Sequence, residues 1–357
     1  MRVLMLPRYD SLGASSRLRM LQYIPALEAA GIHVDAAPLL DDGYVSDLYS
    51  GRVSPAKVLR AYVRRLRLLW TGRSHDLIWL EKELFPWLPA WLERFLLPGR
   101  TPLVVDYDDA VFHRYDQHRL ALVRWLLGRK IDRVMRRADM VIVGNDYLAE
   151  RARAAGAAQV EWLPTVVDLQ RYPPRAIKET ADDVVIGWIG SPATAHYLHL
   201  VAAAIAAVAS RHAIRCVAIG ARPDQVSGTP FEAWPWSESD EVSMLYRIDI
   251  GIMPLPDAPW EKGKCGYKLI QYMACGLPVV ASPVGVNTQI VQQGETGELA
   301  RSTAEWTQAI ERLVTDVERR RRMGEAGRQR VQRDYSLQAQ AHRLVGLLRQ
   351  AAPRAES

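Results

Sequence analysis

The residues best suited to chemistry lie in the segment 261–285, where a glycine-rich basic loop precedes a helical pattern. Lys264, Lys268 and Gln271 are four and three residues apart, so a helix over 265–275 is expected to carry them on one face near its start. Two ammonium groups, an amide and the free N–H groups of a helix N-terminus would bind a diphosphate that carries a hydroxyl-bearing group. The alternative is a helix with two solvated lysines, which the flanking glycines disfavour.

A second cluster consists of the carboxylates of Asp106, Asp108 and Asp109, which follow an apolar run. Crowded carboxylates either bind a cation or raise one another's pKa for proton transfer. The alternative is a set of solvated loop acids, one of which caps the next helix. We favour a catalytic role for Asp108 or Asp109, because Asp106 falls within the expected strand.

A third candidate is the loop after the first strand, where Gly13, Ser15, Ser16 and Arg17 lead into a helical pattern. The free N–H groups and positive end of that helix would suit a phosphate. The alternative is an ordinary N-cap by Ser15 or Ser16. The loop lacks G-x-G-x-x-G, which argues against a dinucleotide.

Short apolar runs alternate with helical patterns along the chain, which predicts parallel sheets covered by helices on both faces. Strands are expected at 2–7, 32–37, 76–80, 102–106, 140–143, 160–163, 184–189, 214–219, 248–253 and 277–281. Helices are expected at 16–30, 54–71, 87–97, 117–138, 146–155, 194–210, 239–246, 265–275, 303–315, 318–333 and 337–350. The polar segment 171–183 has two prolines and predicts a linker.

The fold class is therefore α/β, with two Rossmann-like domains that face each other across a cleft. Residues 1–170 would form the first domain and 184–335 the second. A C-terminal helix and tail, 336–357, would cross back to the first domain.

Composition narrows the class of protein. The 357 residues are 49% hydrophobic and 24% charged, which excludes a disordered chain. No apolar run is long enough to span a membrane and the start lacks a signal peptide, so a cytoplasmic protein is expected. The three cysteines are widely spaced, which excludes a disulfide scaffold and a cysteine zinc site. A net charge of +6 indicates an anionic partner, but no nucleic-acid-binding motif is present.

The segment 271–281 reads Q-Y-M-A-C-G-L-P-V-V-A. It resembles the signature E-A-M-A-x-G-x-P-V-V-A of the GT-B glycosyltransferases of the retaining "group 1" (family four-like) type. Four other segments resemble further motifs of that family in the same order along the chain: 141–150, 163–168, 186–191 and 249–255.

Two features depart from the family pattern. The family has two glutamates eight residues apart, which fall at Gly263 and Gln271 here, with Glu261 two residues away. The second glutamate holds the donor ribose, and Gln271 can hydrogen-bond a hydroxyl without charge.

The Arg and Lys that grip the donor phosphates in that family follow Gly190 and fall at Ser191 and His196. Lys264 and Lys268 would supply that charge. The histidine near the reacting carbon falls at about 106–109.

The resemblance implies an enzyme that moves a sugar from a nucleotide-diphosphate donor to a hydroxyl of a glycan or lipid-linked acceptor, in cell-surface glycan or glycolipid synthesis of bacterial type. It implies no cofactor and no obligatory metal, although Asp106-Tyr-Asp108 spells the D-x-D that holds a divalent ion in another glycosyltransferase fold. The alternatives are a non-catalytic relative that binds sugar nucleotides or a protein partner, and a GT-B enzyme of another reaction type, such as an epimerase.

The helical pattern at 56–70 has an apolar stripe opposite a basic one, and no acid occurs between Leu48 and His75. An ordinary helix that covers a sheet explains the apolar stripe. The basic stripe suits an anionic membrane surface, which predicts a peripheral location on the inner face of the membrane.

Overall fold

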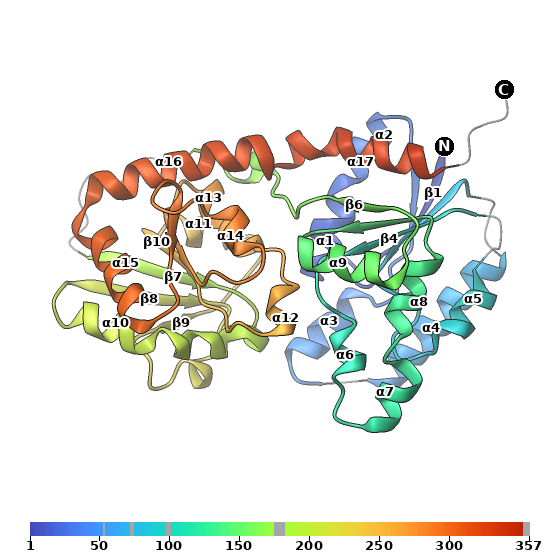
Figure 1. Ribbon diagram of the computed structural model, residues 1–357, viewed down its shortest axis with the longest axis horizontal. Helices are drawn as coiled ribbons and strands as arrows, with labels where there is room; N and C mark the ends of the chain where they lie inside the picture. The colour runs from blue at the N-terminus through green and yellow to red at the C-terminus, as the bar shows by residue number, and fades with distance from the viewer. Residues whose placement is uncertain (53, 72–74, 98–100, 175–182, 353–357) are drawn as a thin grey trace. The chain divides into compact units, whose positions relative to one another are not determined.

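The computed structural model describes residues 1–352 except 53, 72–74, 98–100 and 175–182 (Figure 1). Contacts divide the chain into two compact units. Unit 1 comprises Met1–Thr165, Gly263–Cys265 and Gln340–Ser357, and unit 2 comprises Val166–Lys262 and Gly266–Ala339. Each unit is built on one sheet of six parallel strands.

The sheet of unit 1 has the strand order β2-β1-β3-β4-β5-β6. Its strands are β1 (Arg2–Leu6), β2 (His33–Ala36), β3 (Leu77–Glu81), β4 (Leu103–Tyr107), β5 (Met140–Val143) and β6 (Val160–Trp162). β3, β4 and β5 are buried along their whole length, which explains their continuous apolar runs. The strand order reverses between β1 and β3, and this position is where ligands of such sheets bind.

The helices of unit 1 are α1 (Ala14–Arg19), α2 (Ile24–Ala29), α3 (Asp42–Tyr49), α4 (Pro55–Thr71), α5 (Ala90–Leu96), α6 (His113–Asp116), α7 (Ala121–Leu127), α8 (Lys130–Arg137) and α9 (Asp146–Ala155). Inward-facing side chains of α4, α5, α8 and α9 join one hydrophobic core with β3 and β4. The last helix, α17 (Leu337–Ala351), also contacts unit 1, where Arg349 donates to the carbonyl of Ala30 at 2.6 Å.

The sheet of unit 2 has the order β12-β11-β10-β7-β8-β9, which reverses between β7 and β10. Its strands are β7 (Val184–Ile189), β8 (Ile214–Ile219), β9 (Glu232–Trp234), β10 (Ile250–Met253), β11 (Val279–Ala281) and β12 (Gly297–Leu299). Its helices are η3 (Pro192–Leu200), α10 (Ala202–Ala209), α11 (Glu241–Leu245), α12 (Pro259–Lys262), α13 (Tyr267–Ala274), α14 (Asn287–Ile290), α15 (Thr303–Thr315) and α16 (Val317–Asp334). Three short 3₁₀ turns complete the described elements: η1 (Leu21–Tyr23), η2 (Leu169–Arg171) and η4 (Pro223–Gln225).

Three helices expected to be continuous are broken. The pattern at 16–30 is interrupted by the 3₁₀ turn η1, after which α2 begins with a proline in its first turn. The pattern at 117–138 divides at Gly128, and the pattern at 194–210 bends between η3 and α10. Strands β9 and β12 and helix α3 were not expected.

The division between the units falls at Thr165, a few residues before the expected end of the first domain at 170. Of the expected linker, residues 175–182 lie outside the described part of the chain, as does the tail from 353. Within the described residues, no single helix is long and apolar enough to cross a membrane. One bent pair of helices, η3 with α10, has the combined length and apolar composition of a membrane span, but this rests on length and composition only.

Candidate functional site

In each unit, polar residues gather at the carboxyl ends of the strands where the strand order reverses. In unit 1 these ends belong to β1, β3 and the adjacent β4, and in unit 2 to β7 and β10. The cluster of unit 1 is rich in carboxylates, and that of unit 2 contains a lysine.

The cluster of unit 1 is centred on the hydroxyl of Ser15, at the start of α1. Ser15 donates to the carboxylates of Glu81 and Asp108, and accepts a hydrogen bond from Nζ of Lys82 at 2.7 Å. Lys82 also forms an ion pair with Asp108 at 2.8 Å. Burial acts to lower the pKa of Lys82, but Asp108 and Glu81 outweigh it and hold that pKa above its ordinary value, so the ammonium group is charged.

Glu81 and Lys82 were not among the expected site residues. Glu81 ends β3 and Lys82 follows it with φ of 63°, in the left-handed region that few residues other than glycine adopt. The run E-K-E at 81–83, where the buried strand ends, is the feature of the sequence that could have identified them. Its connection to Ser15 depends on β1 and β3 being neighbours, which the sequence alone does not show.

Asp106 is a structural residue of this cluster. Both of its carboxylate oxygens accept hydrogen bonds from the buried guanidinium of Arg19, at 2.8 and 3.0 Å. Arg19 also donates to the carbonyl of Leu163 at 2.7 Å, so the pair ties α1 to β4 and the segment after β6. Burial raises the pKa of Asp106 to about 6, even though Arg19 acts in the opposite direction.

Asp108 and Asp109 have different environments. Burial acts to raise the pKa of Asp108, but Lys82 and the hydrogen bond from Ser15 outweigh it and hold that pKa below its ordinary value. Burial raises the pKa of Asp109, and the charge of Asp108 raises it further. Within the described residues, the Asp109 carboxylate makes no hydrogen bond or ion pair. Asp109 therefore has the free carboxylate that a general base requires.

Ser15 and Ser16 were expected to bind donor phosphates together with Gly13 and Arg17. Both serine hydroxyls donate to carboxylates instead, Ser16 to Glu81. Arg17 donates to the carbonyl of Ser11 at 2.8 Å. Gly13 is required sterically, since a Cβ there would lie 2.2 Å from Cβ of Tyr9. This geometry favours a role in ordering the acidic cluster, and the assignment to donor phosphates stays a prediction.

The segment Gly263–Cys265 belongs to unit 1 by its contacts. Asn145 Nδ2 donates to the carbonyls of Gly263 and Lys264 at 2.9 and 3.0 Å, and the Cys265 thiol donates to the carbonyl of Asp108 at 3.1 Å. The expectation that Lys264 shares a helical face with Lys268 and Gln271 is wrong. Helix α13 begins only at Tyr267, after Gly266 adopts the left-handed conformation with φ of 66°.

The cluster of unit 2 is formed by Lys268 in the first turn of α13 and by the segment after β7. Nζ of Lys268 lies 4.3 Å from the ring centre of Trp188 and donates to the hydroxyl of Thr194 at 3.4 Å. Gly190 lies against both groups, and a Cβ there would be 2.5 Å from the Trp188 ring and 2.6 Å from Nζ. Because Gly190 has no side chain, its backbone can lie close to the ammonium group of Lys268 at the reversal point. This arrangement suits an anion.

Ser191 and His196 both have exposed side chains, Ser191 immediately before η3 and His196 within it. The ring of His196 packs at 4.2 Å from that of Tyr197. The hydroxyl of Tyr197 donates to Glu261, so this glutamate is buried in a contact within unit 2.

Gln271 is buried on α13 and engaged in an internal network. Its amide nitrogen donates to Glu241 at 2.9 Å and to the hydroxyl of Tyr172 at 3.1 Å. Glu241 also accepts from Tyr172 at 3.0 Å and from the indole of Trp236 at 3.0 Å. Glu241 therefore supplies a buried carboxylate beside the position where the family pattern has a glutamate.

The charges in unit 1 do not suit a divalent ion at Asp106-Tyr-Asp108. The two carboxylates are already paired with Arg19 and Lys82. Among the described residues, no group of three or more His, Cys, Asp or Glu side chains is arranged to hold a metal.

Residues 183–316 match the family model described as Glycosyl transferases group 1. N-acetyl-alpha-D-glucosaminyl L-malate synthase of Bacillus anthracis is 37% identical over 78 residues, which are 21% of this chain and 20% of that enzyme. Sucrose-phosphate synthase from Thermosynechococcus elongatus has a TM-score of 0.72 at 19% identity over 98% of both chains. HepE of Anabaena, solved in complex with UDP-glucose, has a TM-score of 0.71 at 15% identity over 98% of this chain and 100% of that one.

Two α/β units on parallel sheets are the fold of the GT-B glycosyltransferases, so the fold class expected from the sequence is confirmed. The resemblance to group 1 glycosyltransferases is also confirmed, and the matched segment contains both Gly190 and Lys268.

Proposed function

We propose that the protein is a glycosyltransferase that moves a sugar from a nucleoside-diphosphate donor to an acceptor hydroxyl with retention of anomeric configuration. The observation that carries this proposal is the match of residues 183–316 to group 1 glycosyltransferases, together with the Lys268 and Gly190 cluster at the reversal point of the same unit. In the reaction, the bond between the anomeric carbon and the donor phosphate oxygen breaks. A bond from that carbon to the acceptor oxygen forms, and the acceptor proton is taken up by a base.

Unit 2 would bind the donor. The leaving nucleoside diphosphate gains negative charge as the sugar departs, and Lys268 with the N–H groups of α13 would stabilise that charge. Uracil is the first base to test, because HepE of Anabaena was solved with UDP and with UDP-glucose.

Unit 1 would contribute Asp109, which would orient the acceptor hydroxyl or accept its proton. The acceptor would be a glycan or a lipid-linked sugar, and the reaction would take place in the cytoplasm at the inner face of a membrane. No metal would be required, so turnover is expected to persist in EDTA.

The first experiment is calorimetric titration of the protein with nucleoside diphosphates. Lys268→Ala removes a charge-assisted contact of about 1.5–3 kcal/mol, so we expect affinity for the preferred diphosphate to fall by roughly 10- to 100-fold. Lys262→Ala is the matched control, because Lys262 lies six residues away and is ion-paired with Asp257 at 3.1 Å. Equal affinities of the two variants would contradict the assignment of Lys268.

A non-catalytic relative that binds sugar nucleotides is the second candidate. It is favoured by Gln271, whose amide nitrogen is engaged with Glu241 and Tyr172. Mass spectrometry of reactions with UDP-sugars and lipid-linked or oligosaccharide acceptors separates the two functions. Nucleotide binding without any transferred or hydrolysed sugar would support the second candidate against the first.

A further inference from the structure

Large apolar side chains are unevenly exposed on this protein. Of the 13 exposed large hydrophobic residues in the described chain, ten lie between Leu59 and Leu126. They include every exposed tryptophan and phenylalanine among the described residues: Trp70, Trp87, Trp91, Phe95 and Trp125. Trp70, Phe95 and Trp125 are each more than three-quarters exposed, at 78%, 79% and 79%. Aromatic side chains exposed to this degree in one region mark an interaction surface.

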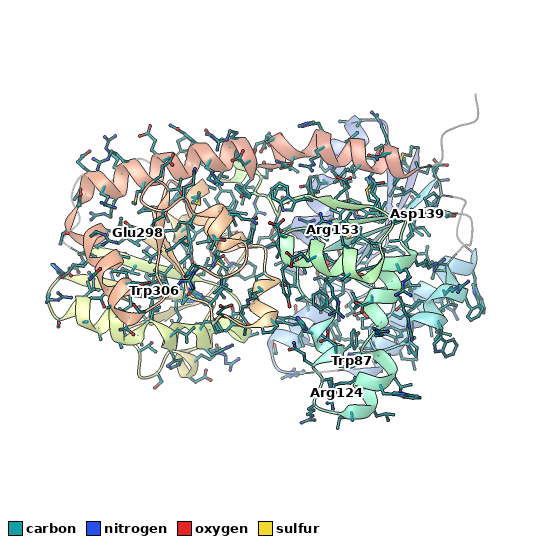
Figure 2. The ribbon with its side chains drawn as sticks, in the orientation of Figure 1. Trp87, Arg124, Asp139, Arg153, Glu298 and Trp306 are labelled. Atoms are coloured by element: carbon teal, nitrogen blue, oxygen red, sulfur yellow. The ribbon has the colours of Figure 1, made fainter. Side chains whose placement is uncertain are left out.

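These residues belong to neighbouring elements of unit 1. α4 packs against α5, α5 against α8, and α7 against α8, as Figure 1 shows for this part of the unit. α4, α5 and α8 share one core below them, to which Tyr62, Ala90 and Ile131 contribute. Their outer sides therefore form one continuous surface, which we call the α4–α8 face, and Figure 2 labels Trp87 and Arg124 on it.

The α4–α8 face carries positive charge. Exposed arginines lie among the apolar groups: Arg60, Arg64, Arg67, Arg94, Arg119, Arg124, Arg129, Arg133 and Arg136. No acidic residue occurs between Leu48 and His75, and of the described acidic side chains between Trp87 and Met140 only Asp139, which follows α8, is exposed. Asp116 and Asp132 are paired with Arg151 at 3.2 and 2.7 Å.

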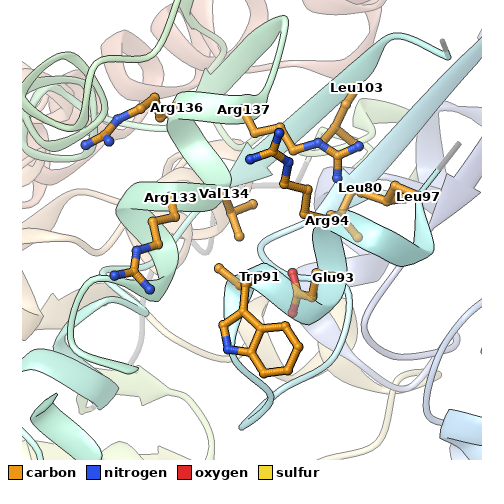
Figure 3. A pocket seen from close by; sticks show the side chains of 11 residues that line it. Leu80, Trp91, Glu93, Arg94, Leu97, Leu103, Arg133, Val134, Arg136 and Arg137 are labelled. Carbon is orange, nitrogen blue, oxygen red and sulfur yellow. The ribbon is translucent and has the colours of Figure 1, made fainter. Parts of the chain in front are cut away.

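A cavity of about 720 Å³ opens on this face between α5 and α8. Its floor is apolar, with Leu80, Leu103 and Val134, and Trp91 stands at its edge. Four arginines line it, Arg94 from α5 and Arg133, Arg136 and Arg137 from α8. Figure 3 shows the guanidinium groups of Arg94 and Arg137 close to each other.

The charged side chains that line the cavity are mostly cations. Glu93 also lines it but is buried and paired with Lys130 at 2.9 Å. Within the described residues, Arg94, Arg133 and Arg137 form no ion pair. Burial and the charge of Arg94 lower the pKa of Arg137, although Asp139 and Glu93 act in the opposite direction.

We propose that the α4–α8 face docks on a bilayer that contains anionic lipid, and that the arginine-lined cavity receives the phosphate of a lipid headgroup. Exposed tryptophan, phenylalanine and leucine mixed with many arginines and little exposed acid are typical of surfaces that insert at the headgroup level. Arginine binds phosphate with paired N–H groups, and an apolar cavity floor suits the start of an acyl chain. The inference does not depend on the proposed transfer reaction, because it rests on other residues.

The test uses co-sedimentation of the full-length protein with vesicles of phosphatidylcholine, with or without phosphatidylglycerol. We expect binding to the mixed vesicles to be at least tenfold tighter than to phosphatidylcholine alone, and to weaken as salt is added. Equal binding to both vesicles, or no binding to the mixed ones, would overturn the proposal.

Two double variants assign the binding to this face. Trp91→Ser with Phe95→Ser removes apolar anchors, and Arg94→Ser with Arg137→Ser removes cavity charge. Each is expected to weaken binding to the mixed vesicles by about tenfold or more. The matched controls lie in unit 2: Leu200→Ser with Val317→Ser for exposed apolar groups, and Arg301→Ser with Arg322→Ser for exposed cations.

If the control variants weaken vesicle binding as much as the variants of the α4–α8 face do, the assignment to this face is overturned. Thermal unfolding of all four variants guards against a loss of fold, and a variant that melts well below wild type is replaced by Trp125→Ser, because Trp125 is 79% exposed. Sedimentation equilibrium without vesicles supplies a second readout. A dimer that becomes monomeric in Trp91→Ser with Phe95→Ser would mean that the face joins two copies of the chain, which contradicts the proposal.

Discussion

The two units place opposite kinds of chemistry at the same position of the same fold. In unit 1, the reversal point between β1 and β3 is occupied by Ser15, Glu81, Lys82 and Asp108, which contact one another through hydrogen bonds and an ion pair. In unit 2, Lys268 lies at the reversal point between β7 and β10, beside a glycine and the face of Trp188. The charged groups of the first cluster pair with one another. In the second cluster, Lys268 and the backbone at Gly190 lie close together, an arrangement that suits an anion.

This difference shows that a cluster of charged side chains is not in itself a binding site. Most of the charge of this cluster of unit 1 is paired internally, whereas the nearby carboxylate of Asp109 makes no hydrogen bond or ion pair within the described residues. The cluster of unit 2 is built differently, with Lys268 against the ring of Trp188 and the hydroxyl of Thr194. Variants that remove the internal ion pairs of Lys130, the carboxylate of Asp109, or the network around Gln271 test this difference.

The largest effect is expected from Lys130, which belongs to the internal charge of unit 1. Its buried Nζ lies 2.6 Å from Glu83 and 2.9 Å from Glu93. Lys130→Met leaves the buried carboxylate of Glu93 without its cation and that of Glu83 with Arg8 alone, and should lower the free energy of unfolding by about 3–5 kcal/mol. Urea denaturation followed by circular dichroism measures it.

Lys57→Met is the control for this prediction, since Lys57 pairs with Asp47 at the partly exposed surface of the same unit. Such a surface pair contributes about 1 kcal/mol or less. A loss in Lys130→Met no larger than in Lys57→Met would mean that the internal charges of unit 1 are not stabilising its structure.

The next effect concerns the carboxylate without a partner. Asp109→Asn keeps the shape and removes the charge, so turnover should fall by roughly 10²-fold or more while affinity for the nucleoside diphosphate stays nearly unchanged. The raised pKa of Asp109 fixes the direction of the pH dependence, because a base acts only when ionised. Turnover should therefore rise with pH through a pKa above that of an ordinary aspartate, and this limb should disappear in Asp109→Asn.

Asp108→Asn should behave differently. The lowered pKa of Asp108 means that its ion pair stabilises the fold at pH values above the ordinary aspartate pKa, and that this stability is lost as pH falls through the lowered value. Asp108→Asn should thus lower the melting temperature at neutral pH, whereas Asp109→Asn should leave it unchanged or raise it. The reverse pattern would exchange the roles of the two residues.

Much of the fold could be predicted because its strands are buried on both faces. Such strands are continuous apolar runs, and β5, β7 and β8 begin and end at the expected residues. The edge strands β9 and β12 were missed, because three residues reading E-A-W or G-E-L carry no such signal. Helix α13 begins later than expected because Gly266 interrupts the backbone before it.

The candidate site was harder to predict than the fold, because its pairs depend on strand order. Lys82 meets Ser15 only because β1 and β3 are neighbours in the sheet, although the two residues are 67 positions apart. The sequence identified Lys268, Asp108 and Asp109 as candidates from their local patterns. It gave no sign that Glu241 would lie beside Gln271.

The smallest effect is expected from that last pair, and it tests how unit 2 differs from the family pattern. Gln271→Glu would restore the glutamate of the pattern but place it against Glu241, where the amide nitrogen now donates at 2.9 Å. Two buried carboxylates this close raise the pKa of one of them, so one must stay protonated. We expect a loss of about 1–3 kcal/mol in the free energy of unfolding at neutral pH. The loss should shrink as pH falls, because the raised pKa favours the protonated folded state.

The double variant Gln271→Glu with Glu241→Gln restores one carboxylate and one amide, and should recover most of the stability. Urea denaturation of the wild type, both single variants and the double variant forms a complete cycle. A double variant no more stable than the sum of the single changes predicts would show that Gln271 and Glu241 do not act as a pair, and Gln271 would then be free to serve the donor directly.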